Sequence, residues 1–507
     1  MILATETVDR DVVLTADVCV VGSGAGGATV ARALSARGRS VVVIEEGPYL
    51  DSRRFTQREE SMVPLLYSQL GLRAVTDATV MIVHGAVVGG SSVVSDCVCE
   101  RLPPALLSQW SERFGLKGLG PAKLAPYFER AEAQAHVQPL APTDVNANNA
   151  ALKTGAERLG IRYRLVAHNR VDCVGCGYCA LGCAYDRKAE ARTVDIPAAS
   201  RAGAVIVPDC RVERIVLENG YAAGVSGRFL RSHGGRAHTL GVRARAVVVA
   251  GGAIGSPTLW LRSQLPNTHR RVGRHLHLLP QVVVAAEFPD EIACWKGIPQ
   301  AVVVDQFLDL ERRAGGGYCF APFTAHPIAL AALLPGFGGD QRALMQVFPR
   351  LAMAAVRLHD RTAGRVELDP AGQLAIAYHL SETERANLLD GMRRLTDLYL
   401  AAGATRVVLP YNALVEVTRR GEFRAIDERP WHANDPLLFS YHPQGTLRMG
   451  TDPKRSVVDE YGRAHEVRGL FVADASVFPS STAVPPQLAV MALAQRTAAY
   501  IADTWKA

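Results

Sequence analysis

Asp17-Val18-Cys19-Val20-Val21 runs directly into Gly22-Ser23-Gly24-Ala25-Gly26-Gly27, and this stretch decides the fold of the chain. The apolar run predicts a buried parallel strand, and residues 28–37 have the composition of a helix. Between them, Gly22 permits a tight turn, Gly24 lets backbone N–H groups approach a pyrophosphate, and Gly27 allows close helix packing. The succession of strand, glycine turn and helix therefore predicts a dinucleotide-binding unit.

An acidic residue follows this unit at the distance that is typical of dinucleotide binding. A second apolar run, from Ser40 to Ile44, ends at Glu45, roughly twenty residues beyond the glycines. A carboxylate at this place accepts hydrogen bonds from ribose hydroxyls and disfavours a 2′-phosphate. These residues alone leave both FAD and NAD open as the dinucleotide.

Composition indicates a large globular protein. The chain has 507 residues, 48% of them hydrophobic and 21% charged, which is enough for two domains with substantial cores. Its net charge of +7 comes from scattered arginines, and no basic run is dense enough to predict nucleic-acid binding. No apolar run has the length of a membrane-spanning helix, and no charged leader precedes an apolar stretch. We therefore expect a cytoplasmic protein without a transmembrane segment.

Signals of a strand entering a turn recur later in the chain. Val247-Val248-Val249 leads to Gly251, and the apolar run from Leu470 to Ala473 precedes Asp474. We therefore predict an α/β fold in which one Rossmann-like domain is assembled from separated stretches of sequence.

An interposed domain of α+β type lies between those stretches in this prediction. Alternating residues at 364–368 and 374–378 predict antiparallel strands, and residues 381–402 predict a helix. The interposed sheet would form a roof over the dinucleotide. The boundaries that we predict are 1–165, 196–290 and 441–507 for the dinucleotide-binding domain, 166–195 for a cysteine-rich loop, and 291–440 for the substrate-binding domain.

Further landmarks occur in a fixed order from end to end. They are Glu45-Glu46-Gly47-Pro48, Gly89-Gly90-Ser91-Ser92, residues 251–257, Val272-Gly273-Arg274, residues 360–366, His442-Pro443-Gln444-Gly445-Thr446 with Arg448-Met449-Gly450, and residues 474–479. With these landmarks the chain resembles the glucose-methanol-choline (GMC) oxidoreductase family. Within that family it is most similar to the branch of fatty-alcohol and sterol oxidases and dehydrogenases.

The resemblance implies FAD in an extended pose, with Asp474 on the ribityl or phosphate side. A final helix that starts at Pro485-Pro486 would direct its positive N-terminal dipole toward the reduced flavin. Some members bind FAD covalently through a His where this chain has Val94, so we expect non-covalent FAD. The residues implied at the cofactor are Gly22, Gly24, Ala25, Gly26, Gly27, Glu45, Gly89, Gly90, Ser91, Val212, Gly251, Asp474, Ala475, Pro486 and Gln487.

The resemblance also places the active-site histidine at His442. Oxidation of an alcohol removes the hydroxyl proton while a hydride leaves the carbinol carbon for flavin N5, and a neutral imidazole is a suitable base. We expect oxidation of an apolar alcohol of fatty, sterol or terpenoid type, with His442 as the acid–base group. The apolar substrate is suggested by hydrophobic residues of the interposed segment, among them Trp295, Phe320 and Phe323.

One active-site position departs from the family pattern. A second polar side chain, His or Asn, is replaced by Pro485, which has neither a side-chain donor nor a backbone N–H. A common Asn is likewise replaced by Ser95. Two other functions therefore stay open: reduction, desaturation or isomerisation of an activated C–C bond, and electron transfer by a flavoprotein without alcohol chemistry. The candidate replacements for the missing polar group are Tyr441, Gln487, His326 and Tyr318.

A cysteine run forms a second unusual feature. Cys173, Cys176, Cys179 and Cys183 have the spacing C-x2-C-x2-C-x3-C, which is typical of iron–sulfur ligands. A structural zinc, disulfides or free thiols are the alternatives, and a cytoplasmic location disfavours disulfides. A cluster would carry electrons from the flavin to an external acceptor, which favours a dehydrogenase over an oxidase. The sequence does not identify that acceptor.

Overall fold

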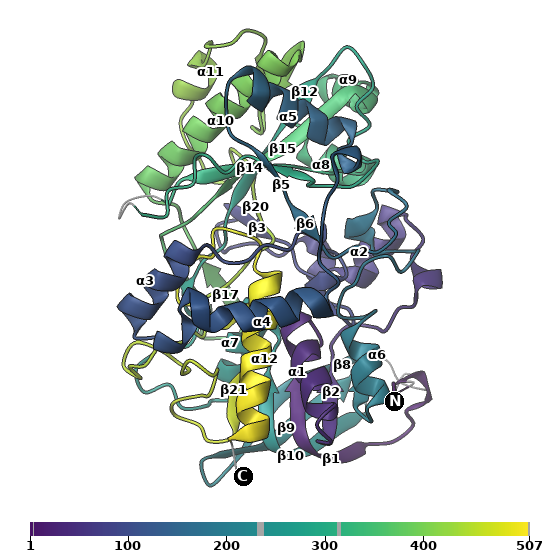
Figure 1. The fold of residues 1–507 in the computed structure, drawn as a ribbon, viewed down its shortest axis with the longest axis vertical. Helices are drawn as coiled ribbons and strands as arrows, with labels where there is room; N and C mark the ends of the chain where they lie inside the picture. The colour runs from purple at the N-terminus through teal and green to yellow at the C-terminus, as the bar shows by residue number, and fades with distance from the viewer. Residues whose placement is uncertain (4, 231–237, 312–315, 505–507) are drawn as a thin grey trace.

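The computed structural model describes residues 1–507 except 4, 231–237, 312–315 and 505–507. Two sheets organise the described residues. One occupies the lower half of the molecule in Figure 1 and the other the upper half. We call them the dinucleotide sheet and the roof sheet.

The dinucleotide sheet is mostly parallel. Its order is β7-β2-β1-β10-β9-β8, and β21 pairs with the C-terminal part of β10. Four parallel pairings, β7–β2, β2–β1, β1–β10 and β10–β21, form the Rossmann-like part, and β9 and β8 add antiparallel strands. The strands are β1 Val12–Val21, β2 Val41–Ile44, β7 Val205–Val207, β8 Cys210–Glu218, β9 Tyr221–Phe229, β10 Thr239–Val249 and β21 Leu470–Val472.

Both faces of this sheet are covered, as expected for buried parallel strands. Helices α1 (Ala25–Ser35), α6 (Asp195–Arg201) and α12 (Gln487–Asp503) contribute to the core on one face. Helix α7 (Gly252–Arg262) contributes to the core on the other face. Figure 1 shows α12 in yellow beside α1 in purple, with α4 (Pro121–Gln134) crossing them.

The roof sheet is largely antiparallel. Its order is β14-β15-β12-β18-β19, with β20 attached to β12 and β3 attached to β20. Helices α10 (Glu382–Ala402) and α5 (Ala147–Arg158) pack together and against β14 and β15. The strands are β3 Val80–Ile82, β12 Gln281–Glu287, β14 Tyr318–Pro322, β15 Leu351–Leu358, β18 Arg406–Val408, β19 Glu416–Val417 and β20 Leu438–Ser440.

The predicted elements of both regions are present. The first two apolar runs are β1 and β2, the later ones are β10 and β21, and Ser381 caps the predicted helix α10. The predicted strands β16 (Gly364–Leu368) and β17 (Leu374–Ala377) pair antiparallel. They join β11 (Arg274–Leu276) in a small separate sheet and not the roof sheet.

The remaining helices surround the two sheets. They are α2 Glu59–Leu66, α3 Pro104–Phe114, α8 Pro327–Leu333, α9 Gly339–Gln346 and α11 Arg424–Asp427. None of the helices in the described part of the chain combines the length and apolar character needed to cross a membrane.

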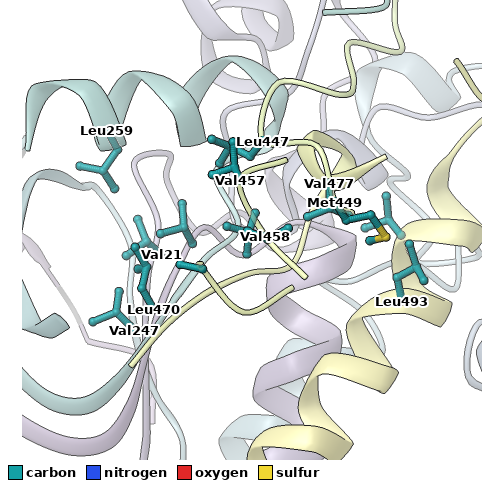
Figure 2. Packing of buried hydrophobic residues seen from close by; sticks show 14 of the residues in the cluster. Val21, Val247, Leu259, Leu447, Met449, Val457, Val458, Leu470, Val477 and Leu493 are labelled. Atoms are coloured by element: carbon teal, nitrogen blue, oxygen red, sulfur yellow. The ribbon is translucent and has the colours of Figure 1, made fainter. Parts of the chain in front are cut away.

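The chain that follows β20 connects the two sheets. Gly445, Leu447 and Met449 donate their backbone N–H groups to carbonyls of residues 475–477, beside the end of β21. Figure 2 shows Leu447 and Met449 in one apolar cluster with Val21, Val247 and Leu470 of the dinucleotide sheet. The segment that begins at Tyr441 is therefore anchored in the core below it.

Candidate functional site

The glycines between β1 and α1 are required by close backbone contacts. Gly22 has φ +102°, and a Cβ atom there would lie 2.3 Å from the carbonyl oxygen of Ala250. A Cβ on Gly26 would lie 1.7 Å from the oxygen of Ala473, and one on Gly27 would lie 2.0 Å from the oxygen of Gly22. These distances exclude any side chain, so the turn brings β10 and β21 against the start of α1.

Gly24 and Gly90 approach each other closely in front of this turn. A Cβ on Gly24 would lie 3.9 Å from the Cα of Gly90, and a Cβ on Gly90 would lie 2.8 Å from the Cα of Gly24, so the two backbones meet with no side chain between them. Gly89 and Gly90 have φ values of +102° and +56°, which place the Gly89-Gly90-Ser91 turn opposite the first turn of α1. The N-terminus of α1 offers its first N–H groups to an anion at this point.

A buried carboxylate ties the two turns together. Glu45, at the end of β2, accepts hydrogen bonds from the backbone N–H of Ser23 (2.9 Å), the hydroxyl of Ser23 (2.8 Å) and the N–H of Gly47 (3.1 Å). Gly89 donates its N–H to the Ser23 hydroxyl oxygen at 2.9 Å. Burial raises the pKa of Glu45 although these donors oppose the shift.

Asp474, which follows β21, is a second buried carboxylate that links loops by accepting hydrogen bonds. It accepts hydrogen bonds from the N–H groups of Gly252 and Ser476, both at 2.8 Å, and from the hydroxyls of Ser256 and Ser476. Gly251 precedes α7, so Asp474 joins the start of α7 to the turn at Ala475. Its carboxylate organises the loops, and burial raises its pKa.

Three other predicted cofactor residues lie in β8 and at the start of α12. Val212 is in β8, two residues after Cys210, whose N–H donates to the carbonyl of Glu45. Pro486 is the N-cap residue of α12 and Gln487 is its first residue. Because α12 packs beside α1, its N-terminus belongs to the same end of the fold as the glycine turn.

We call the glycine turn, Glu45, residues 89–91 and Asp474 the cradle. The backbone donors at the start of α1, the lack of side chains at Gly24 and Gly90, and the buried acid at Glu45 fit the dinucleotide part of FAD. In such a complex the backbone of residues 24–27 would hold the pyrophosphate, and Glu45 would face the ribose.

His442 lies where the anchored segment leaves the roof sheet. Its N–H donates to the Ser440 hydroxyl at 3.3 Å, and Gln444 Nε2 donates to its carbonyl at 3.1 Å. Nδ1 is buried without a partner, and neither ring nitrogen bonds a group of the described residues. Burial, with the positive charge of Arg357, lowers the pKa of His442 to about 3, so the ring is neutral at physiological pH.

Three candidates for the missing polar group lie in different surroundings. The Tyr318 hydroxyl donates to Asp390 on α10, on the face of the roof sheet that carries the α10 core. His326 is buried, neither of its ring nitrogens has a partner, and its ring lies 4.2 Å from that of Tyr178. Tyr441 precedes His442, and its ring lies 6.5 Å from that of Phe323.

The iron–sulfur prediction is not supported. Cys173, Cys176, Cys179 and Cys183 do line one cavity, and all ten cysteines are free thiols. Among the residues that the structure describes, however, no three His, Cys, Asp or Glu side chains are grouped to hold a metal ion.

Another cation already lies among these thiols. The Nη1 of Arg170 is 3.1 Å from the sulfur of Cys179 and 3.8 Å from that of Cys173. A hydrogen bond from Cys97 and the charge of Arg170 lower the pKa of Cys179. The buried guanidinium thus supplies the positive charge that a metal would otherwise bring.

Sequence reasoning missed two residues of the site. Ser23 occupies a variable position of the glycine motif, so the pattern gave no reason to expect that it links Glu45 to Gly89. Arg357 is buried in β15, with 4% of its surface exposed, although the rest of that strand is apolar. The sequence signal that could have identified Arg357 was a single arginine within an apolar run of residues.

Comparison with known proteins identifies the family. The model of the GMC oxidoreductase N-terminal region matches residues 62–281, and that of the C-terminal region matches 360–494. A model of NAD(P)-binding Rossmann-like domains matches 20–66. An uncharacterised GMC-type oxidoreductase of Mycobacterium tuberculosis is 34% identical over 499 residues, which cover 96% of this chain and 76% of that protein. A long-chain-alcohol oxidase of Arabidopsis thaliana, FAO3, is 30% identical over 515 residues, covering 94% and 66%.

Solved structures agree in fold. Pyridoxine 4-oxidase from Mesorbium loti superposes with a TM-score of 0.68 at 19% identity, covering 95% of this chain and 98% of that one. Formate oxidase superposes with a TM-score of 0.71 at 16% identity, covering 98% and 99%. With both family models matched in order and a relative that is 34% identical over 96% of this chain, this chain belongs to the GMC oxidoreductase family.

Proposed function

We propose that the protein is an FAD-dependent oxidoreductase that oxidises the C–OH group of an apolar alcohol of fatty, sterol or terpenoid type. The observation that carries this proposal is His442: a neutral imidazole, without a hydrogen-bond partner, on the segment that joins the cradle to the roof sheet. FAD, when bound, supplies the acceptor for the hydride that leaves the carbinol carbon.

His442 is suited to accept the hydroxyl proton. Its Nδ1 is enclosed, so Nε2 is the nitrogen left to meet a substrate. The backbone contacts with Ser440 and Gln444 fix the residue from both sides. A general base held in this way typically contributes about 10²- to 10⁴-fold to the rate.

The surroundings of His442 favour an apolar substrate. Tyr441 precedes it and lies 6.5 Å from Phe323 between ring centres, and the face of the roof sheet that carries Arg357 also carries Ala355, Met353 and Val283 of an apolar cluster. Pockets for small molecules combine such a lining with a few polar groups. The long-chain-alcohol oxidases among the relatives support the same substrate class.

The test is anaerobic bleaching of the flavin absorbance by an alcohol panel. Dodecanol, cholesterol and farnesol represent the three substrate types, and dodecane is the control that lacks the hydroxyl. We expect at least one alcohol, and not dodecane, to bleach the flavin. Bleaching by dithionite alone would contradict the proposal and favour an electron-transfer flavoprotein.

Pro485 favours a second candidate function, the reduction, desaturation or isomerisation of an activated C–C bond. This residue is buried just before α12 and offers no hydrogen-bond donor, and such reactions need one proton donor but no paired clamp on an alcohol. Consumption of an enone by the dithionite-reduced protein, with no bleaching by alcohols, would select this candidate.

The electron acceptor is a separate question. Our expectation of a dehydrogenase rested on an iron–sulfur cluster, and the described residues offer no site for that cluster. Among the proteins named above, FAO3, pyridoxine 4-oxidase and formate oxidase are oxidases. Dioxygen consumption and peroxide formation during turnover distinguish an oxidase from a dehydrogenase that needs an added quinone or dye.

A further inference from the structure

Arg357 is a buried cation without a carboxylate partner. Only 4% of its surface is exposed, its Nε is enclosed without a hydrogen bond, and it forms no ion pair with a described residue. Its polar neighbour is the thiol of Cys319 on β14. The acids whose charge reaches Cys319, Glu100 and Asp305, already pair with Arg164. An unpaired buried charge costs several kcal/mol, so a group that offsets the charge is expected from outside the chain.

The pairing of strands places Arg357 on the side of the roof sheet that leads to His442. Arg357 is opposite Cys319 in β14 and opposite Gln281 in β12, and Gln281 is opposite Phe439 in β20. Directly paired residues share a face of the sheet. This row of side chains therefore includes the strand that continues into Tyr441 and His442.

Two further contacts bring the same face to the active-site end of the molecule. His359, two residues beyond Arg357, has its Nε2 3.4 Å from the carbonyl oxygen of Ser481, in the segment that leads to Pro485. In the other direction along the face, Ala355 is opposite Ala321 and Val283. Along its strand, Arg357 is therefore followed on one side by small apolar side chains and on the other by His359, which contacts Ser481.

We propose that Arg357 contacts the reacting oxygen of the substrate and stabilises the negative charge that develops on it. This inference rests on the proposed alcohol oxidation and names the group that replaces the side chain missing at Pro485. The hydroxyl proton passes to His442, and the O–H electron pair stays on the oxygen, where the guanidinium donates hydrogen bonds. That pair then forms the C=O bond as the carbon gives up its hydride to the bound cofactor.

The electrostatics agree with this division of roles. Arg357 is the charged group that acts on His442, and its field helps to keep that ring neutral. Hydrogen bonds from a guanidinium to the oxygen make its proton more acidic and so assist the transfer of that proton to the neutral ring of His442. Because the charge on the oxygen grows during the reaction, the interaction is stronger in the transition state than with bound alcohol.

The experiment compares wild type with Arg357→Gln, Arg357→Lys and the control Arg365→Gln, whose ion pair with Glu367 is exposed. Single-turnover bleaching by dodecanol measures the reaction, and calorimetric titration with dodecanoate, a stable oxyanion, measures anion binding. We expect Arg357→Gln to slow bleaching at saturating dodecanol by about 100-fold, as loss of an oxyanion donor does. Dodecanoate affinity should fall at least about tenfold, since hydrogen bonds to charged groups contribute about 1.5–3 kcal/mol. FAD content should stay unchanged, and Arg357→Lys should recover part of both losses.

The two readouts separate this inference from the proposed function. If no alcohol bleaches the wild type, dodecanoate binding still reports on Arg357 as an anion-binding residue. Wild-type bleaching and dodecanoate affinity in Arg357→Gln would overturn the inference. Loss of FAD in that variant would also overturn it, because Arg357 would then hold the cofactor. A loss of dodecanoate binding with an unchanged bleaching rate would make Arg357 a carboxylate anchor, which equally contradicts the proposed role.

Discussion

The cradle and the roof sheet differ in how they treat buried polar groups. In the cradle, Glu45 accepts three hydrogen bonds and Asp474 accepts four, all from protein groups. On the face of the roof sheet near His442, the Nδ1 of His442 and the Nε of Arg357 are buried without a partner. An unpartnered buried group costs about 1–3 kcal/mol, and more if it is charged.

This difference indicates what each region is built to do. In the cradle the protein itself satisfies Glu45 and Asp474, which fixes the backbone that would hold a cofactor. On the face of the roof sheet near His442, by contrast, His442 and Arg357 lack such partners and are available to a reacting molecule, although Tyr318 on the other face donates to Asp390. A change confined to one region tests whether its effect stays within that region.

The largest effect is expected from Gly26→Ala in the cradle. The new Cβ would lie 1.7 Å from the carbonyl oxygen of Ala473, so α1 or β21 must shift. We expect loss of FAD and destabilisation by about 3 kcal/mol or more, the upper end of overpacking effects. Absorbance at the flavin band and the unfolding temperature measure both. Gly255→Ala is the control, since a Cβ there meets nothing within 4 Å; equal behaviour of the two variants would contradict the steric argument.

Replacing His442 by Ala should affect chemistry alone. We expect a fall of about 10³-fold in the rate of flavin reduction by alcohol, within the range for loss of a general base. FAD content and the unfolding temperature should remain near those of the wild type, because His442 is outside the cradle. Stopped-flow bleaching measures the rate. The control is His379→Ala, which replaces an exposed histidine that follows β17. Turnover at the wild-type rate would remove His442 from the proposed mechanism.

Glu45→Gln should weaken the cradle without abolishing it. An amide NH₂ is a donor and cannot accept the hydrogen bonds that a carboxylate oxygen of Glu45 accepts. One of these bonds would be lost, and the link between Ser23 and Gly89 would weaken. We expect FAD affinity to fall by about 10-fold, since one charged hydrogen bond contributes about 1.5–3 kcal/mol. Fluorescence titration of apoprotein with FAD measures the affinity. Glu46→Gln, on the exposed Arg211 pair, is the control and should bind FAD normally.

The smallest effect concerns pH. Because the pKa of His442 is lowered to about 3, the ring stays deprotonated from pH 5 to 8, and its protonation should not reduce the bleaching rate in this range. A histidine with an ordinary pKa of about 6.5 would lose about thirtyfold at pH 5. In Arg357→Gln, removal of a positive charge raises the pKa of His442, so loss of rate on acidification should begin at higher pH. A wild-type rate that falls between pH 7 and 5 with a midpoint near 6.5 would contradict a buried neutral ring.

Much of the cradle could be read from local sequence. At Gly22, Gly26 and Gly27, a Cβ atom would lie about 2 Å from the nearest backbone atom. Glu45 is at the end of its predicted strand. The pattern is local because one strand, one turn and one helix create the requirement. The cysteine spacing was an equally clear pattern, but it did not reveal that Arg170 inserts among the thiols.

The dinucleotide unit, the strands and helices around it and the family resemblance could all be predicted from sequence, because they depend on periodicity and on glycines that neighbouring backbone requires. The folded chain was needed to reveal that Ser23 bridges two turns, that Tyr318 faces α10, and that Arg357 lies unpaired on the row leading to His442. The physical reason is that a side chain's partners come from strands far apart in the chain, and no local pattern specifies which of them meet.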